Sequence, residues 1–324
     1  MVELIVQDII TGLAYNLSAV VSEVSWSTHF DDQPGELTFT FLKTPSYKLE
    51  LGSGVSMRVN NNGIFFGFIF DVEYAGDEVS VTALDQMRYL KNKDTYVLAG
   101  LTASQVFTRL CSDFMLQYRV ANATGYTLAP QVHDGKSLYE IMKDAMDETL
   151  RATGEMYTVY DHYGTLVFRA VMDMKTHIRI GGGSLLSAYT FNRSIDEDTY
   201  NQIKLIREDE ETATREVYIT KDTLNINRWG VLQHYETVDE SANYAQIKEY
   251  GENLLKTKNR ETKMLSLECL GDLRIRAGSG IAVGIEELAE QGLNQNRAYI
   301  VQSCTHTFAS DLHTMTIELD IEVV

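Results

Sequence analysis

The sequence predicts a mainly β protein of the α+β class, with two β-barrel domains separated by a small inserted α+β domain. Three observations predict this: apolar and polar residues alternate at period two near both ends, the period becomes helical in the middle, and a short motif near the front recurs near the back. We expect the first β-barrel domain in residues 1–95, the inserted α+β domain in residues 96–180 and the second β-barrel domain in residues 181–324.

The first 95 residues carry strand signals. Leu37–Phe41 alternates apolar and polar side chains, as a strand with one buried face does. Asn62-Gly63, between Met57–Val59 and Ile64–Phe70, predicts a hairpin with a tight primed turn, because both residues tolerate positive φ. Val79–Ala83 adds another alternating strand.

From about residue 96 the pattern becomes helical. Thr102 and Gln105 have capping-box spacing ahead of an apolar face that runs to Met115. Ser137 and Glu140 repeat this spacing before a second amphipathic helix, which Gly154 is expected to end. Two strands should follow, at Met156–Tyr160 and Thr165–Phe168.

We interpret Gly181–Gly183 as a linker. Beyond it, residues 202–207 and 216–220 predict a hairpin around an acidic tip at residues 208–211, and residues 241–258 predict a third amphipathic helix. The last strand alternates most clearly, with one apolar face formed by Met315, Ile317, Leu319, Ile321 and Val323.

A weak internal echo links the two ends of the chain. Gly52–Met57 resembles Gly278–Val283, and each is followed by a turn, an apolar strand and an alternating strand. Gly-Ser-Gly before a strand is common, so the match can arise by chance. Alternatively, it marks two related β-barrels separated by an inserted domain.

The charge excludes several functions. Among 324 residues, 46 are acidic and 28 are basic, which gives a formal net charge of −18. Stable nucleic-acid binding and docking on anionic lipid both need Lys and Arg, so neither is expected. No stretch approaches the length of a membrane span, and the N-terminus has no signal-peptide pattern, so we expect no membrane insertion. Three widely spaced cysteines fit folding in a reducing cytoplasm.

The sequence predicts no catalytic, cofactor-binding or metal-binding residue. It has no Cys-x-x-Cys, His-Glu-x-x-His, Gly-x-Ser-x-Gly or phosphate-binding loop. Cys304 and His306 could form half a metal site, but a buried cysteine beside a surface-facing histidine is the preferred interpretation. The acids at Asp147-Glu148 and Asp196–Asp198 are expected on the solvated surface. Six more histidines have no evident partners: His29, His133, His162, His177, His234 and His313.

The segment Asp85–Tyr96 resembles a run shared by the XkdQ/YqbQ family, which comprises baseplate hub proteins of contractile phage tails, defective prophages and phage-tail-like bacteriocins. We expect its polar residues to be structural, satisfying local backbone groups. The similarity spans essentially the whole chain, and it continues at Trp26, Pro34–Phe39, Asn201–Ile203, Arg228–Gln233, Ala277–Gly280, His306 and His313.

This resemblance implies a non-enzymatic virion structural protein. Three copies, each with two tube-type β-barrel domains, would adapt the hexameric tail tube to the trimeric central spike. It implies a homotrimer with the tail tube protein, the central spike protein and other baseplate proteins as partners, and no cofactor. The protein would be made in the bacterial cytoplasm and end in the baseplate. A tail-associated peptidoglycan hydrolase and a receptor-binding tail-tip protein are the alternatives.

The acids are unevenly distributed. Residues 1–95 and 179–324 carry net charges of −7 and −9, whereas residues 96–178 carry −2. Under the hub hypothesis, part of this excess faces the channel, where it would repel DNA phosphates or an acidic tape segment. The alternative is that it serves solubility alone.

Overall fold

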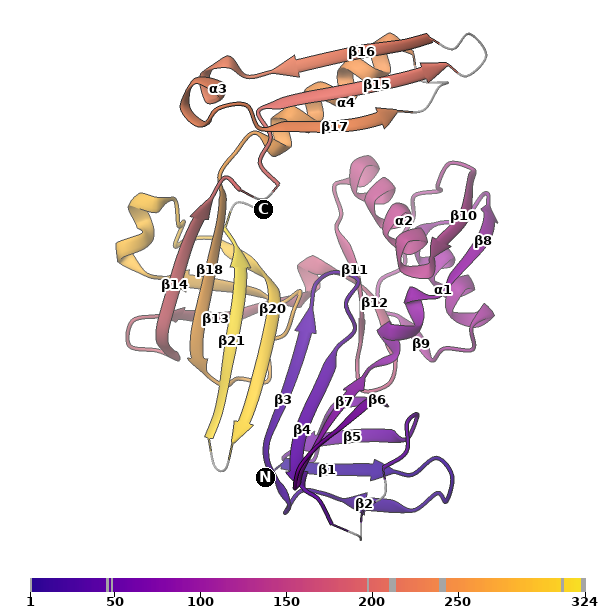
Figure 1. Ribbon diagram of the computed structural model, residues 1–324, viewed down its shortest axis with the longest axis vertical. Coiled ribbons are helices and arrows are strands. Elements are labelled where there is room, and N and C mark those ends of the chain that lie inside the picture. The colour runs from indigo at the N-terminus through magenta and orange to yellow at the C-terminus, as the bar shows by residue number, and fades with distance from the viewer. Residues whose placement is uncertain are drawn as a thin grey trace. The chain divides into compact units, whose positions relative to one another are not determined.

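A computed structural model of the chain describes residues 2–44, 47, 49–196, 198–209, 214–238, 243–309 and 312–321. It is mainly β, with 50% strand and 21% helix, which confirms the mainly β class. The chain divides into two compact units (Figure 1). The larger unit combines Met1–Thr190 with Ser266–Val324, and the smaller unit is Phe191–Leu265.

One large, chiefly antiparallel sheet organises the larger unit. Its order is β14-β18-β21-β20-β3-β4-β7-β6-β5-β1-β2, with β19 beside β20 and β13 beside β19. Strands β14 and β18 each extend into the smaller unit. The strands are β1 (Val2–Gln7), β2 (Ala14–Asn16), β3 (Val21–His29), β4 (Glu36–Leu42), β5 (Gly54–Val59), β6 (Asn62–Ala75), β7 (Glu78–Leu84), β13 (Lys175–Gly181), β14 (Leu186–Ser194), β18 (Thr262–Leu270), β19 (Gly280–Gly284), β20 (Ala298–Ala309) and β21 (Leu312–Asp320).

Two groups of five strands in this sheet have the same order. The first group is β3, β4, β7, β6 and β5, and the second group is β14, β18, β21, β20 and β19. The Gly-Ser-Gly echo occupies the same place in both. Gly52 N donates to Ile69 O, and Gly278 N donates to Val301 O, each at 2.8 Å. The echo therefore reflects a repeated strand arrangement and not a chance match.

The two groups are joined edge to edge. Strand β20 of the second group pairs antiparallel with β3 of the first, from Ser303 opposite His29 to Ala309 opposite Glu23. In the described pairings neither group closes into a barrel. Where two separate barrels were expected, the described strands form one continuous sheet made of two like groups.

Alternation places the core on one face of this sheet, as expected for strands with a single buried face. In β7, Val79, Val81 and Ala83 are buried, and Ser80 and Thr82 between them are only half-buried. The last strand follows the expected pattern through Ile321, and Val323 lies outside the described residues.

The turn of the β5–β6 hairpin differs from the prediction. The two turn residues are Asn60 and Asn61, with φ of 50° and 67°, and Asn62 already pairs with Val59. Asparagine adopts positive φ readily, so this pair forms the tight turn two residues before Gly63. Gly63 instead makes room for the ring of Tyr163, which a Cβ atom would approach within 2.6 Å.

The inserted α+β part contains the two expected helices, α1 (Ala103–Asp113) and α2 (Leu138–Thr153). Thr102 N donates to Gln105 Oε1, and Ser137 N donates to Glu140 Oε2, which confirms both capping boxes. The helices share a core with three-stranded and two-stranded sheets. Its other elements are η1 (Gln86–Lys91), β8 (Lys93–Leu98), β9 (Tyr118–Val120), β10 (Gln131–Ser137), β11 (Tyr157–Asp161), β12 (Leu166–Ala170) and η2 (Val171–Met174).

The expectation that Gly181–Gly183 is a linker is wrong. Gly181 ends β13 and pairs with Gly284, and the following residues turn directly into β14. A Cβ atom at Gly181 would lie 2.3 Å from the carbonyl oxygen of Gly284, so close strand approach explains this glycine.

The smaller unit has its own sheet, in the order β16-β15-β17, with helix α4 packed against it (Figure 1). The expected hairpin and third helix are confirmed, with residues 210–211 of the acidic tip and 241–242 of the helix outside the described residues. The bounds are β15 (Gln202–Asp209), β16 (Thr214–Lys221), α3 (Thr223–Trp229), β17 (Gln233–Val238) and α4 (Tyr244–Lys258). No helix among the described residues is long and apolar enough to span a membrane.

Candidate functional site

The junction between the two groups is the first candidate site. At its centre Trp26 of β3 lies opposite His306 of β20. Their rings stack with centroids 5.1 Å apart and planes 17° from parallel. Trp26 is 5% exposed and His306 is fully buried, so backbone pairing and apolar burial both hold this junction.

His306 and His313 form a hydrogen-bonded chain that ends at the backbone carbonyl of Ile275. His306 Nε2 lies 2.9 Å from Ile275 O, which can only accept, so we assign the proton to Nε2. His306 Nδ1 then accepts from His313 Nε2 at 3.0 Å. The expectation that His306 faces the surface, and that His313 has no partner, is wrong. The β20–β21 hairpin brings together two histidines that are seven residues apart.

We expect the larger unit to lose stability in mild acid because of His306. Burial lowers the pKa of His306 to about 4, from about 6.5 when unfolded. The unfolded chain therefore takes up the proton first, and stability falls by up to about 3 kcal/mol as the pH drops from about 6.5 to 4. The raised pKa of Asp161 changes the total stability in the opposite direction over this range. Urea unfolding therefore measures the His306 contribution as the difference between the wild type and His306→Gln.

The control for this pH effect is His306→Gln, whose amide can still donate to Ile275 O. Its stability should fall less with pH than that of the wild type. His29→Gln, at a position on the other face of the sheet, should behave as the wild type does. Equal slopes for the wild type and His306→Gln would contradict the assignment.

The face of the sheet opposite the core forms a second candidate site, which we call the open face. Hydroxyl groups cover much of it. One row of opposed residues crosses six strands, and it consists of Thr314, Thr307, Ser25, Thr38, Thr82 and Asp71. A second row contains Thr316, Thr305, Ser27 and Glu36.

The open face carries acids and no Lys or Arg along its central strands. None of β3, β4, β6, β7, β20 and β21 contains either cation. Its carboxylates include Glu23, Glu36, Glu73 and Glu318, the last of which accepts a hydrogen bond from Ser303 at 3.0 Å. A polar anionic surface of this kind repels other polyanions.

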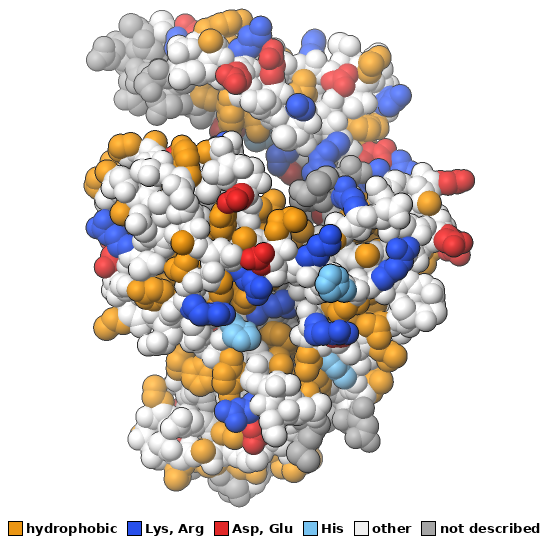
Figure 2. Space-filling model, turned by 180° about the vertical axis from the view of Figure 1, so that it is seen from behind, with side chains coloured by type: hydrophobic (Ala, Val, Ile, Leu, Met, Phe, Trp, Pro, Cys, Tyr) orange, Lys and Arg blue, Asp and Glu red, His pale blue; other side chains and the backbone are white. Residues whose placement is uncertain are grey.

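Lys and Arg side chains gather instead near the middle of the side shown in Figure 2. Arg119 and Arg169 belong to the inserted part, where they help burial to lower the pKa of His162. The net charge of −18 is therefore unevenly distributed over the surface, as well as along the chain.

A buried charge cluster joins three parts of the larger unit. It contains Asp85 at the end of the first group, Asp161 of the inserted part and Arg276 before β19. Asp85 accepts from Gly35 N and Met87 N, each at 2.9 Å, as expected for a structural residue.

Arg276 is the cation of this cluster. Its Nη1 donates to Asp161 O at 2.9 Å, and its guanidinium lies 4.2 Å from the ring centroid of Tyr160. Burial raises the pKa of Asp161 to about 6. Burial and the neighbouring Asp161 hold the pKa of Asp85 well above its usual range. The cluster therefore fixes the inserted part against both groups.

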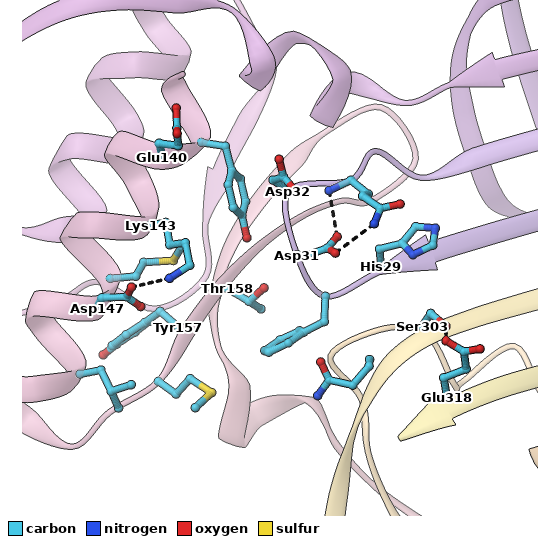
Figure 3. Close-up of a pocket in the computed structure, with 17 residues that line it drawn as sticks. His29, Asp31, Asp32, Glu140, Lys143, Asp147, Tyr157, Thr158, Ser303 and Glu318 are labelled. Carbon is cyan, nitrogen blue, oxygen red and sulfur yellow. Dashed lines mark hydrogen bonds and ion pairs between the residues drawn. The ribbon is translucent and has the colours of Figure 1, made fainter. Parts of the chain in front are cut away.

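An acidic cleft of about 660 Å³ lies between helix α2 and the loop after β3 (Figure 3). Asp31, Glu140 and Glu318 contribute carboxylates to its wall. Lys143 pairs with Asp147 across one helical turn. The carboxylates of the cleft come from separate elements. The ion pair of Asp147 is exposed, which agrees with the expectation that this acid lies on the solvated surface. Glu148 instead accepts from Ala129 N at 2.9 Å.

The sequence-based metal candidate does not gather further ligands. Cys304 Sγ lies 3.3 Å from His306 Nε2, and both are buried. No group of three or more potential metal-binding side chains occurs among the residues that the structure describes. Burial raises the pKa of Cys304 above its ordinary value, which keeps the thiol protonated.

Comparison with known proteins gives one matching family model, YQBQ-like, over residues 24–320. Protein YqbQ of Bacillus subtilis (strain 168) is 30% identical over 277 residues, which cover 84% of this chain and 82% of YqbQ. The phage-like element PBSX protein XkdQ of the same organism is 26% identical over 310 residues, which cover 94% of this chain and 93% of XkdQ.

A solved structure shares the fold across nearly the whole chain. The prophage MuSo2 43 kDa tail protein from Shewanella oneidensis superposes with a TM-score of 0.68 and covers 98% of both chains. Its sequence identity is 13%, so this likeness concerns the fold.

Proposed function

This chain belongs to the YQBQ-like family, and from that premise we propose that it is a non-enzymatic baseplate hub of a contractile tail or phage-tail-like particle. Three copies would adapt the hexameric tail tube to the trimeric central spike. The proposed domains are residues 1–95, 96–180 and 181–324, with tube-type modules first and last. After synthesis in the bacterial cytoplasm, the protein would join the particle beside other baseplate proteins.

The repeated five-strand order carries this proposal. A trimer can match a sixfold partner only if each copy presents two near-equivalent surfaces. The first and second groups have the same strand order, and one copy already joins the second group to the first through β20 and β3. A similar joint between copies would arrange three chains as a ring of six groups.

The open face supports the same proposal. In such a ring, one face of the sheet lines a central channel. The hydroxyl-rich rows, with acids and without Lys or Arg on the central strands, suit a wall past which DNA or an acidic protein segment slides. Solubility explains an acidic surface in general, but it does not explain the absence of Lys and Arg from six whole strands.

Copy number tests the proposed function. We expect native mass spectrometry of the chain mixed with its spike and tube proteins to give three copies per spike trimer and per tube hexamer. The chain alone serves as the reference, since an assembly can require its neighbours. Six copies per tube hexamer, or no complex with either protein, would contradict the hub. Clearing of peptidoglycan in a zymogram would favour a hydrolase instead.

A further inference from the structure

Several strand edges in the described sheet have no partner within the chain, and those of β6 and β14 are two of them. Strand β6 pairs with β5 only as far as Phe68. The rest of the strand, from Phe70 to Ala75, lies beside β7 on one side and has no described strand on the other. Strand β14 pairs only with β18. An exposed edge presents unpaired backbone groups, and proteins usually cover or charge it. These two edges correspond to the two strands that form the junction, β20 and β3.

The correspondence between β6 and β20 is fixed residue by residue. Ile69 N donates to Ser53 O and Val301 N donates to Ser279 O, each at 2.9 Å. The register to the next strand then shifts after Ile69 in β6 and after Val301 in β20. Glu73 therefore corresponds to Thr305, and Tyr74 corresponds to His306.

The correspondence between β14 and β3 follows from the strands beside them. Lys43 N donates to Asp77 O and Gly271 N donates to His313 O, each at 2.8 Å, so Leu42 corresponds to Leu270. Val21 lies opposite Phe41, which places Val20 opposite Leu42. Leu270 N donates to Leu185 O, which places Leu185 opposite Leu270. Val20 therefore corresponds to Leu185. The register of β3 shifts between Val21 and Glu23. We assign the same shift to β14, so that Trp26 corresponds to Phe191.

We propose that β6 of one copy pairs antiparallel with β14 of the next, and that Tyr74 stacks on the neighbouring copy's Phe191. This rests on the proposed function and repeats the geometry of the junction, where His306 stacks on Trp26. Tyr74 is 59% exposed in the single chain, although His306 is fully buried. A second copy would cover this ring and the backbone edge beside it.

The facing residues are compatible in charge. The alignment sets Glu73 opposite Asn192 and Asp71 opposite Ser194, so no carboxylates oppose each other. The outer part of β6 carries neither Lys nor Pro, the residues that commonly block edge pairing. This edge is therefore suited to a second copy of the chain.

Paired cysteines test the register. Glu73→Cys with Asn192→Cys should cross-link neighbouring copies, giving covalent dimers and closed trimers and no larger species on non-reducing gels. The matched control is Ser27→Cys with Thr305→Cys, whose positions are opposed within one chain and should give only an internal bond. Single variants complete the set, and the three native cysteines are buried. The assay uses the full chain with its tube and spike proteins.

The outcomes separate the two proposals. Trimers by native mass without a Glu73→Cys/Asn192→Cys cross-link would overturn the β6–β14 joint and leave the hub standing. Ladders beyond the trimer would overturn the closed ring, and absence of any trimer in the mixture would overturn the hub itself. Tyr74→Ala should weaken trimer formation by about tenfold. Tyr235→Ala, at an exposed tyrosine in β17, should leave it unchanged.

Discussion

Replacing Arg276 with methionine is expected to destabilise the larger unit by about 3–5 kcal/mol. The guanidinium is buried, and it donates to the backbone carbonyl of Asp161. Its charge lowers the pKa values of Asp161 and Asp85 against the effect of burial, so its removal leaves both carboxyl groups without this cation. Methionine fills similar volume, so the loss reports chiefly on charge. Chemical denaturation at neutral pH, followed by circular dichroism, measures it.

The matched control is Arg274→Met, two residues earlier in the same loop. Arg274 is exposed and pairs with Asp272 at the surface, so its loss should cost less than about 1 kcal/mol. Adding Asp161→Asn to Arg276→Met should restore part of the stability, because it removes a buried carboxylate. Equal effects of the Arg276 and Arg274 variants would show that the buried cluster does not join the three parts.

Trp26→Ala is expected to cost about 3–5 kcal/mol and to loosen the junction between the two groups. The indole is buried, and it stacks on His306 across the β3–β20 pairing. Hydrogen exchange should therefore rise first in the amides of β3 and β20. Trp229→Ala, in helix α3 of the smaller unit, should cause a clearly smaller loss and leave the exchange of these strands unchanged. Exchange that rises equally in both variants would contradict this role.

Local signals made much of the fold predictable. Alternation identified β4, β7 and β21 because each has one buried face, and both capping boxes lie within single turns of chain. The β5–β6 turn was displaced by two residues because Asn60 and Asn61 compete with Asn62-Gly63 for the same conformation.

The candidate site depends on contacts that sequence spacing does not encode. Trp26 and His306 are 280 positions apart, and only the pairing of β3 with β20 brings them together. The charge cluster likewise unites Asp85, Asp161 and Arg276 from three regions. The echo at Gly52 and Gly278 was the one sequence signal that pointed to the repeated groups.

The repeated groups give the family resemblance a physical basis. Each group offers one strand edge like β3 and one like β20, and a single chain uses only one of each. In each chain the β3 and β20 edges are paired with each other, and the corresponding β14 and β6 edges are left for neighbouring copies. Such head-to-tail contacts form a closed ring when the rotation from one subunit to the next divides a full turn evenly, and otherwise form a filament. Under the proposed function, the β6 and β14 edges decide whether three chains close into a ring.

In the proposed hub, three chains supply six like groups around one axis. Electron cryomicroscopy of the chain bound to its tube and spike proteins tests this most directly. We expect a threefold ring in which the first and second groups alternate, with the open face toward the channel. A ring of six chains, or one in which only one group per chain surrounds the axis, would contradict it.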